Sequence, residues 1–141
     1  MKMDFNVAIP LGSAAYRETI VTTEVTVHHA YAALPKVYAT PHMIYLMEMA
    51  AADAIGDLLP QGWGSVGTLV DIRHIAATPV DMKVSAIARV IGVNRKSVRF
   101  YCEATDEREV IGQGFHERAI VPLDDFIIQV EQKLSYLGGK Q

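Results

Sequence analysis

Glu48 is the residue of this 141-residue sequence with the clearest chemical potential. It is the only side chain charged at neutral pH between His42 and Asp53, in a stretch that is otherwise apolar. Burying an ion costs on the order of several kcal/mol even after the protein relaxes. Glu48 must therefore meet a partner, face a water-filled cleft or carry a proton, and each state makes it a candidate acid or base. The alternatives are a polar contact between subunits and an ion pair with a core arginine.

His74 is the second candidate, because an imidazole can transfer protons near neutral pH. It ends a strand-like run in which strict alternation places Val66, Thr68, Val70 and Ile72 on the same face. The alternation therefore directs His74 toward the interior. A histidine in such a position can equally be a core residue with a satisfied hydrogen bond, so its function depends on what surrounds it.

Thr40 precedes Pro41 and marks the expected start of a helix, because Thr can cap free backbone N–H groups and Pro is tolerated at the first helical position. A helix N-terminus also carries partial positive charge, which can polarise a carbonyl and stabilise the oxyanion formed on attack. Thr40 and Glu48 are separated along one helix by about 12 Å and by a rotation of about 80°. A compact site that uses both would take one of them from a second subunit.

Glycine occupies three strand positions where it would normally weaken a sheet, at Gly67, Gly112 and Gly114. The missing side chain indicates close approach of another group. That group can be packed protein, with a central helix as the first choice, or the arm of an elongated ligand.

The elements that must position these residues follow from hydrophobic patterning. The sequence predicts a first strand over 18–27, a helix over 40–56 and four further strands over 65–76, 82–93, 97–105 and 109–121. The helix is apolar nearly all round, as expected of a helix enclosed by other structure. Four residues are spaced as the inner stripe of a C-terminal amphipathic helix: Leu123, Ile127, Val130 and Leu134.

One strand, an apolar helix and four antiparallel strands are the order of a hot-dog fold, an α+β architecture in which an antiparallel sheet wraps around a long central helix. We expect one such domain over 1–141, with its core at about 15–133. A sheet of this kind has an exposed edge, and pairing two sheets removes it. The fold therefore favours a homodimer, which can pair further into a tetramer.

Composition narrows the classes of partner. The net charge is -3 and the lysines and arginines are scattered, so no face for nucleic acid is expected. No segment approaches the roughly 20 apolar residues of a membrane span, and the N-terminus lacks the apolar stretch of a signal peptide. With one cysteine, Cys102, the sequence fits a soluble cytoplasmic protein. The histidines lack the spacing of metal ligands, so no metal is expected.

Several segments resemble, in order and spacing, the fluoroacetyl-CoA thioesterase family of hot-dog proteins. The resemblance covers about 15–133. It implies an acyl-CoA thioesterase for a small acyl group, without metal or organic cofactor, and with active sites at a dimer interface. The segments that carry it are Tyr38-Ala39-Thr40, Leu46-Met47-Glu48, Ser65-Val66-Gly67-Thr68, His74 with Ala76-Ala77-Thr78-Pro79, and Gly114-Phe115-His116-Glu117-Arg118-Ala119.

By position, the resemblance implies catalytic roles for Thr40, Glu48 and His74, and places in the active site for Gly67 and Arg118. The family's lid of phenylalanines corresponds here to a loop with Tyr31 and Leu34, which we expect to contact the substrate. Because this loop has lost an aromatic residue, selectivity for the fluoroacetyl group is not implied.

Two other functions are compatible with the residues. One is a hot-dog hydratase or dehydratase acting on an acyl thioester, which would depend on a histidine near the helix start, here His42. The other is a module that binds acyl-CoA without turning it over.

Overall fold

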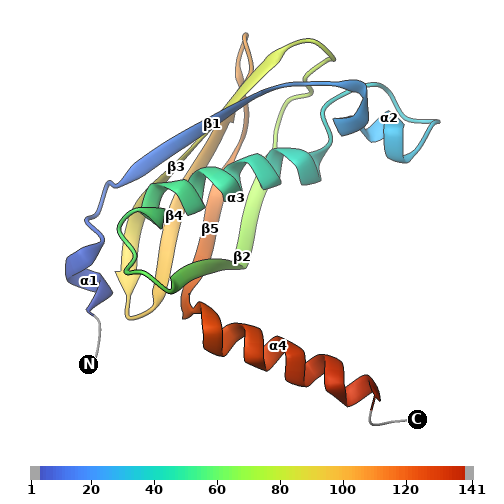
Figure 1. Ribbon diagram of the computed structural model, residues 1–141. Helices are drawn as coiled ribbons and strands as arrows, with labels where there is room; N and C mark the ends of the chain where they lie inside the picture. The colour runs from blue at the N-terminus through green and yellow to red at the C-terminus, as the bar shows by residue number, and fades with distance from the viewer. Residues whose placement is uncertain (1–3, 139–141) are drawn as a thin grey trace.

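The computed structural model describes residues 4–138 and shows a five-stranded antiparallel sheet curved around one long helix, α3 (Figure 1). The sheet order is β1-β3-β4-β5-β2. This arrangement confirms the predicted α+β hot-dog architecture. The elements are α1 (Phe5–Ala8), β1 (Ala14–Ile20), the 3-10 turn η1 (Thr23–Val25), α2 (Val27–Ala30), α3 (Thr40–Gly56), β2 (Trp63–His74), β3 (Lys83–Asn94), β4 (Ser97–Thr105), β5 (Val110–Pro122) and α4 (Leu123–Gly138).

Helix α3 begins and ends where the sequence predicts. Its buried face carries mainly small alanines and flexible methionines, which let the helix lie close against the curved sheet. The buried residues are Met43, Met47, Ala50, Ala51, Ala54 and Ile55. The opposite face is open, and Tyr45 is 62% exposed there. The expectation that α3 is enclosed on all sides is therefore wrong for a single chain, because one sheet covers only the face turned toward it.

Strand β4 shows the predicted alternation. Its even-numbered residues from Val98 to Ala104 are buried, and its odd-numbered residues are half-buried. Cys102 belongs to the buried set, and burial raises the pKa of its thiol to about 12. The thiol is therefore protonated at neutral pH and is not poised as a nucleophile.

The first strand differs from its predicted span of 18–27. Strand β1 begins at Ala14 and pairs with β3 as far as Ile20, and the chain then turns through η1. The Thr26 hydroxyl accepts a hydrogen bond from the His29 backbone N–H and caps α2. The β-branched residues after Ile20 thus form a turn and a helix cap. Thr is favoured both in strands and at helix N-caps, so its presence did not distinguish the two.

The buried core also includes residues before the predicted 15–133. Phe5 and Ile9 are each 1% exposed, and the Phe5 ring packs edge-on to Trp63 at a centroid distance of 5.4 Å. Helix α1 thereby closes one end of the sheet.

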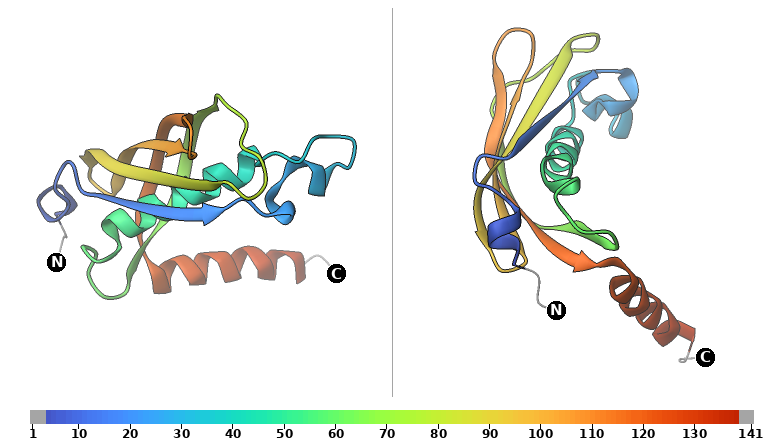
Figure 2. Two further views of the ribbon diagram at one scale, coloured as in Figure 1. Left: turned by 90° about the horizontal axis from the view of Figure 1, so that it is seen from above. Right: turned by 60° about the vertical axis from the view of Figure 1, so that its left-hand side comes forward.

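Helix α4 leaves the body of the molecule and extends away from the sheet (Figure 2). It is amphipathic, as predicted, but the expected inner stripe is exposed, from 39% at Leu123 to 68% at Leu134. The stripe is therefore not covered by the chain's own sheet. Within residues 4–138, no helix is long and apolar enough to cross a membrane.

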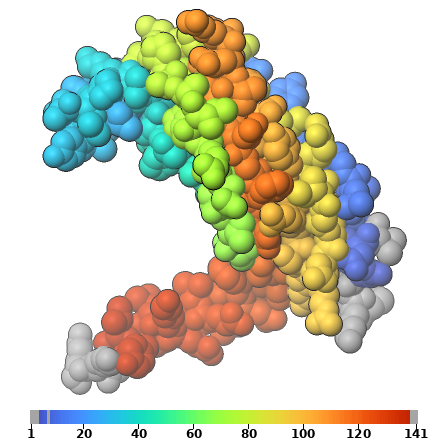
Figure 3. Space-filling model, turned by 180° about the vertical axis from the view of Figure 1, so that it is seen from behind, coloured from blue at the N-terminus to red at the C-terminus, as the bar shows by residue number. Residues whose placement is uncertain are grey.

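Strand β2 forms one edge of the sheet and pairs only with β5 within the described chain. Leu69 and Val70, in the middle of this edge, are 39% and 46% exposed. In the space-filling view the molecule is hollowed along this edge, between the α2 region and α4 (Figure 3). The sheet thus presents the unpaired edge that the fold predicts.

Candidate active site

Thr40 and His74 come together where α3 begins and β2 ends. The Thr40 Oγ1 atom lies 2.7 Å from His74 Nδ1. The predicted capping role of Thr40 is wrong: the N-cap is Ala39, which makes no side-chain cap, and Thr40 is the first helical residue. Its hydroxyl turns to the imidazole instead, which makes a polar pair from residues 34 positions apart.

The His74 imidazole faces the interior, as predicted, and pairs across the sheet with Gly112. Its Nε2 atom is buried and has no hydrogen-bond partner among the described residues. Burial also lowers the pKa of His74 from its ordinary 6.5. A neutral imidazole with one satisfied and one unsatisfied nitrogen is suited to exchange a proton with a ligand or water.

The predicted inward face of β2 is wrong in its first half. A β-bulge shifts the register between Gly67 and Leu69, so Val66 pairs with Ala119, outside the inward set of β5. Gly67, in contrast, pairs with the buried Arg118. One extra residue in a strand reverses the alternation beyond it.

An open pocket of about 300 Å³ adjoins the Thr40–His74 pair. Apart from Thr40 and His74, the residues that line it are largely apolar: Val27, Val37, Tyr38, Ile75, Ala76 and Ala77. In the first turn of α3, Pro41 has no N–H, and the His42 and Met43 N–H groups both donate to the Ala39 carbonyl. Among the described contacts, this leaves the Thr40 N–H as the backbone donor available to a carbonyl oxygen.

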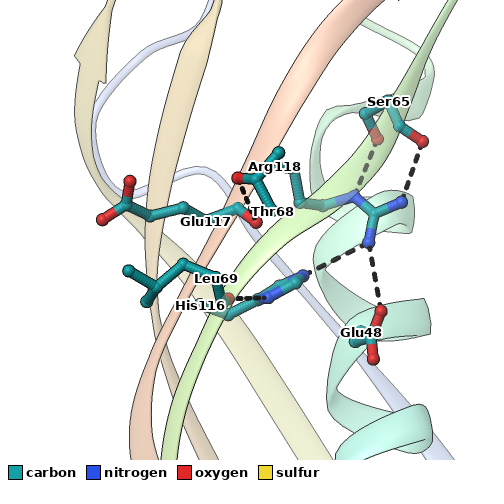
Figure 4. A network of polar contacts seen from close by, with 7 residues as sticks. All are labelled: Glu48, Ser65, Thr68, Leu69, His116, Glu117 and Arg118. Carbon is teal, nitrogen blue, oxygen red and sulfur yellow. Dashed lines mark hydrogen bonds and ion pairs between the residues drawn. The ribbon is translucent and has the colours of Figure 1, made fainter.

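Glu48 lies two turns along α3 in a second polar group (Figure 4). Its Oε2 atom is 3.9 Å from Arg118 NH1, and the Glu48 side chain is 31% exposed while that of Arg118 is 6% exposed. A contact with a core arginine, which the sequence left open as one alternative for Glu48, is therefore present. Glu48 is nevertheless half-buried rather than enclosed.

Gly67 lies directly against the Glu48 carboxylate. A Cβ atom at this position would be 3.1 Å from Glu48 Oε2 and 3.2 Å from His116 Cε1. The two other strand glycines have packing roles, because a Cβ at Gly112 would meet Met43 of α3 at 2.5 Å and one at Gly114 would overlap the β2 backbone. Of the three, Gly67 is the one that keeps space open beside an ionisable group.

The two polar groups remain separate within one chain. In residues 4–138, no hydrogen bond or ion pair joins Thr40 or His74 to Glu48 or Arg118. The first group contains two of the predicted catalytic residues, Thr40 and His74, and the second contains the third, Glu48. The same described range holds no cluster of three His, Cys, Asp or Glu side chains that could bind a metal ion.

The loop after α2 lies beside the pocket but presents other residues to it. Val27, at the start of α2, and Val37, near the end of the loop, line the pocket, whereas Tyr31 and Leu34 do not. These two side chains are 62% and 46% exposed. The loop is tied by a hydrogen bond of 2.9 Å between His28 Nδ1 and the Leu34 carbonyl oxygen.

Comparison with known proteins identifies the family. The model of the fluoroacetyl-CoA-specific thioesterase family matches residues 21–124. The chain belongs to this family. The fluoroacetyl-CoA thioesterase of Streptantibioticus cattleyicolor is 35% identical over 129 residues, which are 87% of this chain and 93% of that protein.

Solved structures of the fluoroacetyl-CoA thioesterase family and its neighbours share the fold. A threonine-to-serine variant of the fluoroacetyl-CoA thioesterase, in complex with acetyl-CoA, is 34% identical with a TM-score of 0.84, over 88% of this chain and 98% of that one. A thioesterase superfamily member from Thermus thermophilus is 31% identical with a TM-score of 0.86, over 94% and 98% of the two chains. The resemblance inferred from the sequence is thus confirmed.

Sequence reasoning missed two residues of the Glu48 group, Ser65 and His116. Both accept hydrogen bonds from the Arg118 guanidinium. The alternation of β5 places His116 and Arg118 on one face, and this pattern could have identified His116. Ser65 contributes its hydroxyl and its backbone carbonyl, which no sequence pattern marks.

Proposed function

We propose that this acyl-CoA thioesterase hydrolyses a small acyl-coenzyme A to the free acid and coenzyme A, using Thr40, Glu48 and His74. The observation that carries the proposal is the Thr40–His74 pair, with its unpartnered Nε2, beside a pocket of about 300 Å³. An apolar pocket of this size suits a short acyl group. A solved relative in complex with acetyl-CoA supports the same class of ligand.

Thr40, Glu48 and His74 have different roles in the proposed reaction. The thioester carbonyl lies at the start of α3, where the Thr40 N–H and hydroxyl can stabilise the negative charge that develops on its oxygen. Glu48 either takes a proton from water, whose oxygen attacks the carbonyl carbon, or attacks that carbon itself to form a transient acyl adduct that water then hydrolyses. In either route the attacking water loses a proton, and the neutral His74 imidazole passes this proton to the thiolate of coenzyme A that leaves as the C–S bond breaks, so His74 is neutral before and after turnover.

The proposal includes a homodimer in which each active site combines two subunits. Antiparallel pairing of two copies about the middle of β2 would place His74, at one end of the strand, opposite the other end of the partner's strand. At that end, Ser65 and Gly67 face the Arg118–Glu48 group. The dimer would therefore bring the Thr40–His74 pair of one subunit to the partner subunit's Glu48. Tyr31 and Leu34 would then lie above a completed site, and dimers could pair further into tetramers.

The unpaired β2 edge gives a direct prediction for this dimer. Val70→Lys places a charge at the centre of the edge, where a two-fold axis would bring two like charges together. We expect a monomer in sedimentation velocity and the loss of acyl-CoA hydrolysis. Ile91→Lys is the matched control, because Ile91 is 42% exposed on β3, away from this edge. A Val70→Lys protein that remains dimeric would contradict the proposed interface.

The proposed activity is tested by measuring free coenzyme A released from acetyl-, fluoroacetyl-, longer straight-chain and aryl-CoA. We expect release from the shorter acyl groups. Tight binding without release would instead indicate a binding module. Hydration of an enoyl-CoA would indicate a hydratase, although His42, on which that chemistry would depend, is exposed and does not line the pocket. A cytoplasmic location belongs to the same proposal and is supported by the single, buried cysteine.

A further inference from the structure

His116 contacts both the backbone of β2 and the side chain of Arg118. It is fully buried on β5, with Nδ1 2.8 Å from the Leu69 carbonyl oxygen and Nε2 3.2 Å from Arg118 NH1. A carbonyl can only accept a hydrogen bond and a guanidinium can only donate. The imidazole must therefore carry its proton on Nδ1 and present a lone pair at Nε2. Burial lowers the pKa of His116, and the charge of Arg118 acts in the same direction.

Every nitrogen of the Arg118 guanidinium is engaged. Nε donates to Ser65 Oγ at 2.8 Å, and NH2 donates to the Ser65 carbonyl oxygen at 2.9 Å. NH1 lies between His116 Nε2 at 3.2 Å and Glu48 Oε2 at 3.9 Å (Figure 4). The nearer acceptor for NH1 is thus the imidazole, and the carboxylate is held at ion-pair distance.

The Glu48 carboxylate consequently keeps its lone pairs. No residue in the described range 4–138 donates a hydrogen bond to it, although Arg118 provides a positive charge close by. A direct hydrogen bond from the guanidinium would occupy a carboxylate oxygen and weaken it as a base or nucleophile. The arrangement therefore supplies charge without a competing hydrogen bond.

His116 also touches the segment that opens the space beside Glu48. The Leu69 carbonyl that accepts from His116 follows the β-bulge after Gly67. The Thr68 hydroxyl at this bulge donates to the Glu117 carbonyl oxygen at 3.2 Å, which fixes the bulge a second time. The bulge is thus held by two bonds, whereas NH1 has no described hydrogen-bond acceptor other than the His116 Nε2 lone pair.

We propose that His116 is a positioning residue of the thioesterase site, whose Nε2 lone pair holds Arg118 NH1 away from a direct hydrogen bond to Glu48. The inference rests on the proposed role of Glu48 in hydrolysis. His116 neither lines the pocket nor contacts the Thr40–His74 pair, so its effect on hydrolysis would act through Arg118 and Glu48.

Two amide substitutions separate this role from support of the bulge. In His116→Gln, the amide oxygen can take the place of Nε2 and accept from Arg118. In His116→Asn, the shorter amide can replace the Nδ1–H donor to Leu69 but leaves NH1 without its acceptor. We expect His116→Asn to lower kcat/KM by about tenfold or more, and His116→Gln to stay within about threefold of wild type, because small displacements of a positioned group have large effects on rate.

Crystal structures of both variants test the same point without turnover. In His116→Asn, Arg118 NH1 should move to hydrogen-bonding distance of Glu48, and in His116→Gln it should stay in place. An unmoved Arg118 in His116→Asn, or activity kept by Asn and lost in Gln, would overturn the proposal. If neither variant folds, imidazole ¹⁵N shifts of wild type decide: a proton on Nε2 at neutral pH contradicts it. Failure of wild type to release coenzyme A would contradict the proposed function alone, since these structural readouts do not depend on activity.

Discussion

Glu48→Gln is expected to lower kcat/KM for acyl-CoA hydrolysis by about 1,000-fold, because the amide can neither accept the proton of water nor attack a carbonyl. The side chain keeps its size, so the packing around Gly67 and Arg118 is retained. The ion pair with Arg118 is long, at 3.9 Å, but the Arg118 side chain is only 6% exposed, so the loss of the nearby carboxylate should lower the free energy of unfolding by on the order of a few kcal/mol. Release of free coenzyme A and thermal unfolding measure the two effects separately.

Asp53→Asn is the matched control for Glu48→Gln. Asp53 lies on the same helix and forms an exposed ion pair with Arg17 at 2.6 Å, so its replacement also converts a carboxylate of α3 to an amide. We expect this variant to keep wild-type turnover. Equal losses in the two variants would point to a general effect on α3, and full activity in Glu48→Gln would refute its catalytic role.

The second large effect concerns the Thr40–His74 pair. His74→Ala removes the proton carrier and should lower kcat/KM by about 100-fold or more. Thr40→Val keeps the β-branched shape but loses the hydroxyl, so we expect it to lower kcat/KM as well. Thr40→Ser keeps the hydroxyl and should keep most of the activity. Steady-state hydrolysis of the preferred acyl-CoA measures all three variants.

The pH dependence of this pair follows from burial of His74. Because burial lowers the pKa of the imidazole from its ordinary 6.5, the neutral form persists to lower pH than for a free histidine. A rate that requires neutral His74 should therefore be retained at pH 6.5 and fall only at lower pH, as the imidazole becomes protonated. Wild-type activity from Thr40→Val, or an activity loss centred above pH 6.5 that disappears in His74→Ala, would contradict the assignment.

Several features of the site could be predicted from the sequence because they depend on local pattern. The Thr-Pro start and the apolar run gave the correct limits of α3, and the alternation of Val98, Phe100 and Cys102 gave the buried face of β4. The inward direction of His74 was also predicted, and the pairing of Glu48 with an arginine was one of the alternatives left open. Each of these features depends on the residue types and spacing within one short segment.

Other features depend on contacts between distant segments, and these were missed or wrong. The Thr40 hydroxyl contacts His74 instead of capping its own helix, because the end of β2 brings an imidazole within hydrogen-bonding distance. The local sequence around Thr40 does not show this partner. The bulge at Gly67 reverses the predicted face of Val66 because alternation carries no sign of an extra residue. The stripe of α4 was taken to face the chain's own core, although amphipathic spacing does not say which surface covers it.

The most direct test of a site shared between subunits mixes two inactive proteins. Glu48→Gln and His74→Ala, carrying different purification tags, are co-expressed and the heterodimer is isolated. If Glu48 and His74 of each site come from different subunits, one site of the heterodimer carries both changes and the other carries neither. We predict about half of the wild-type rate of coenzyme A release, as symmetry requires. A heterodimer as inactive as its parents would contradict the shared site.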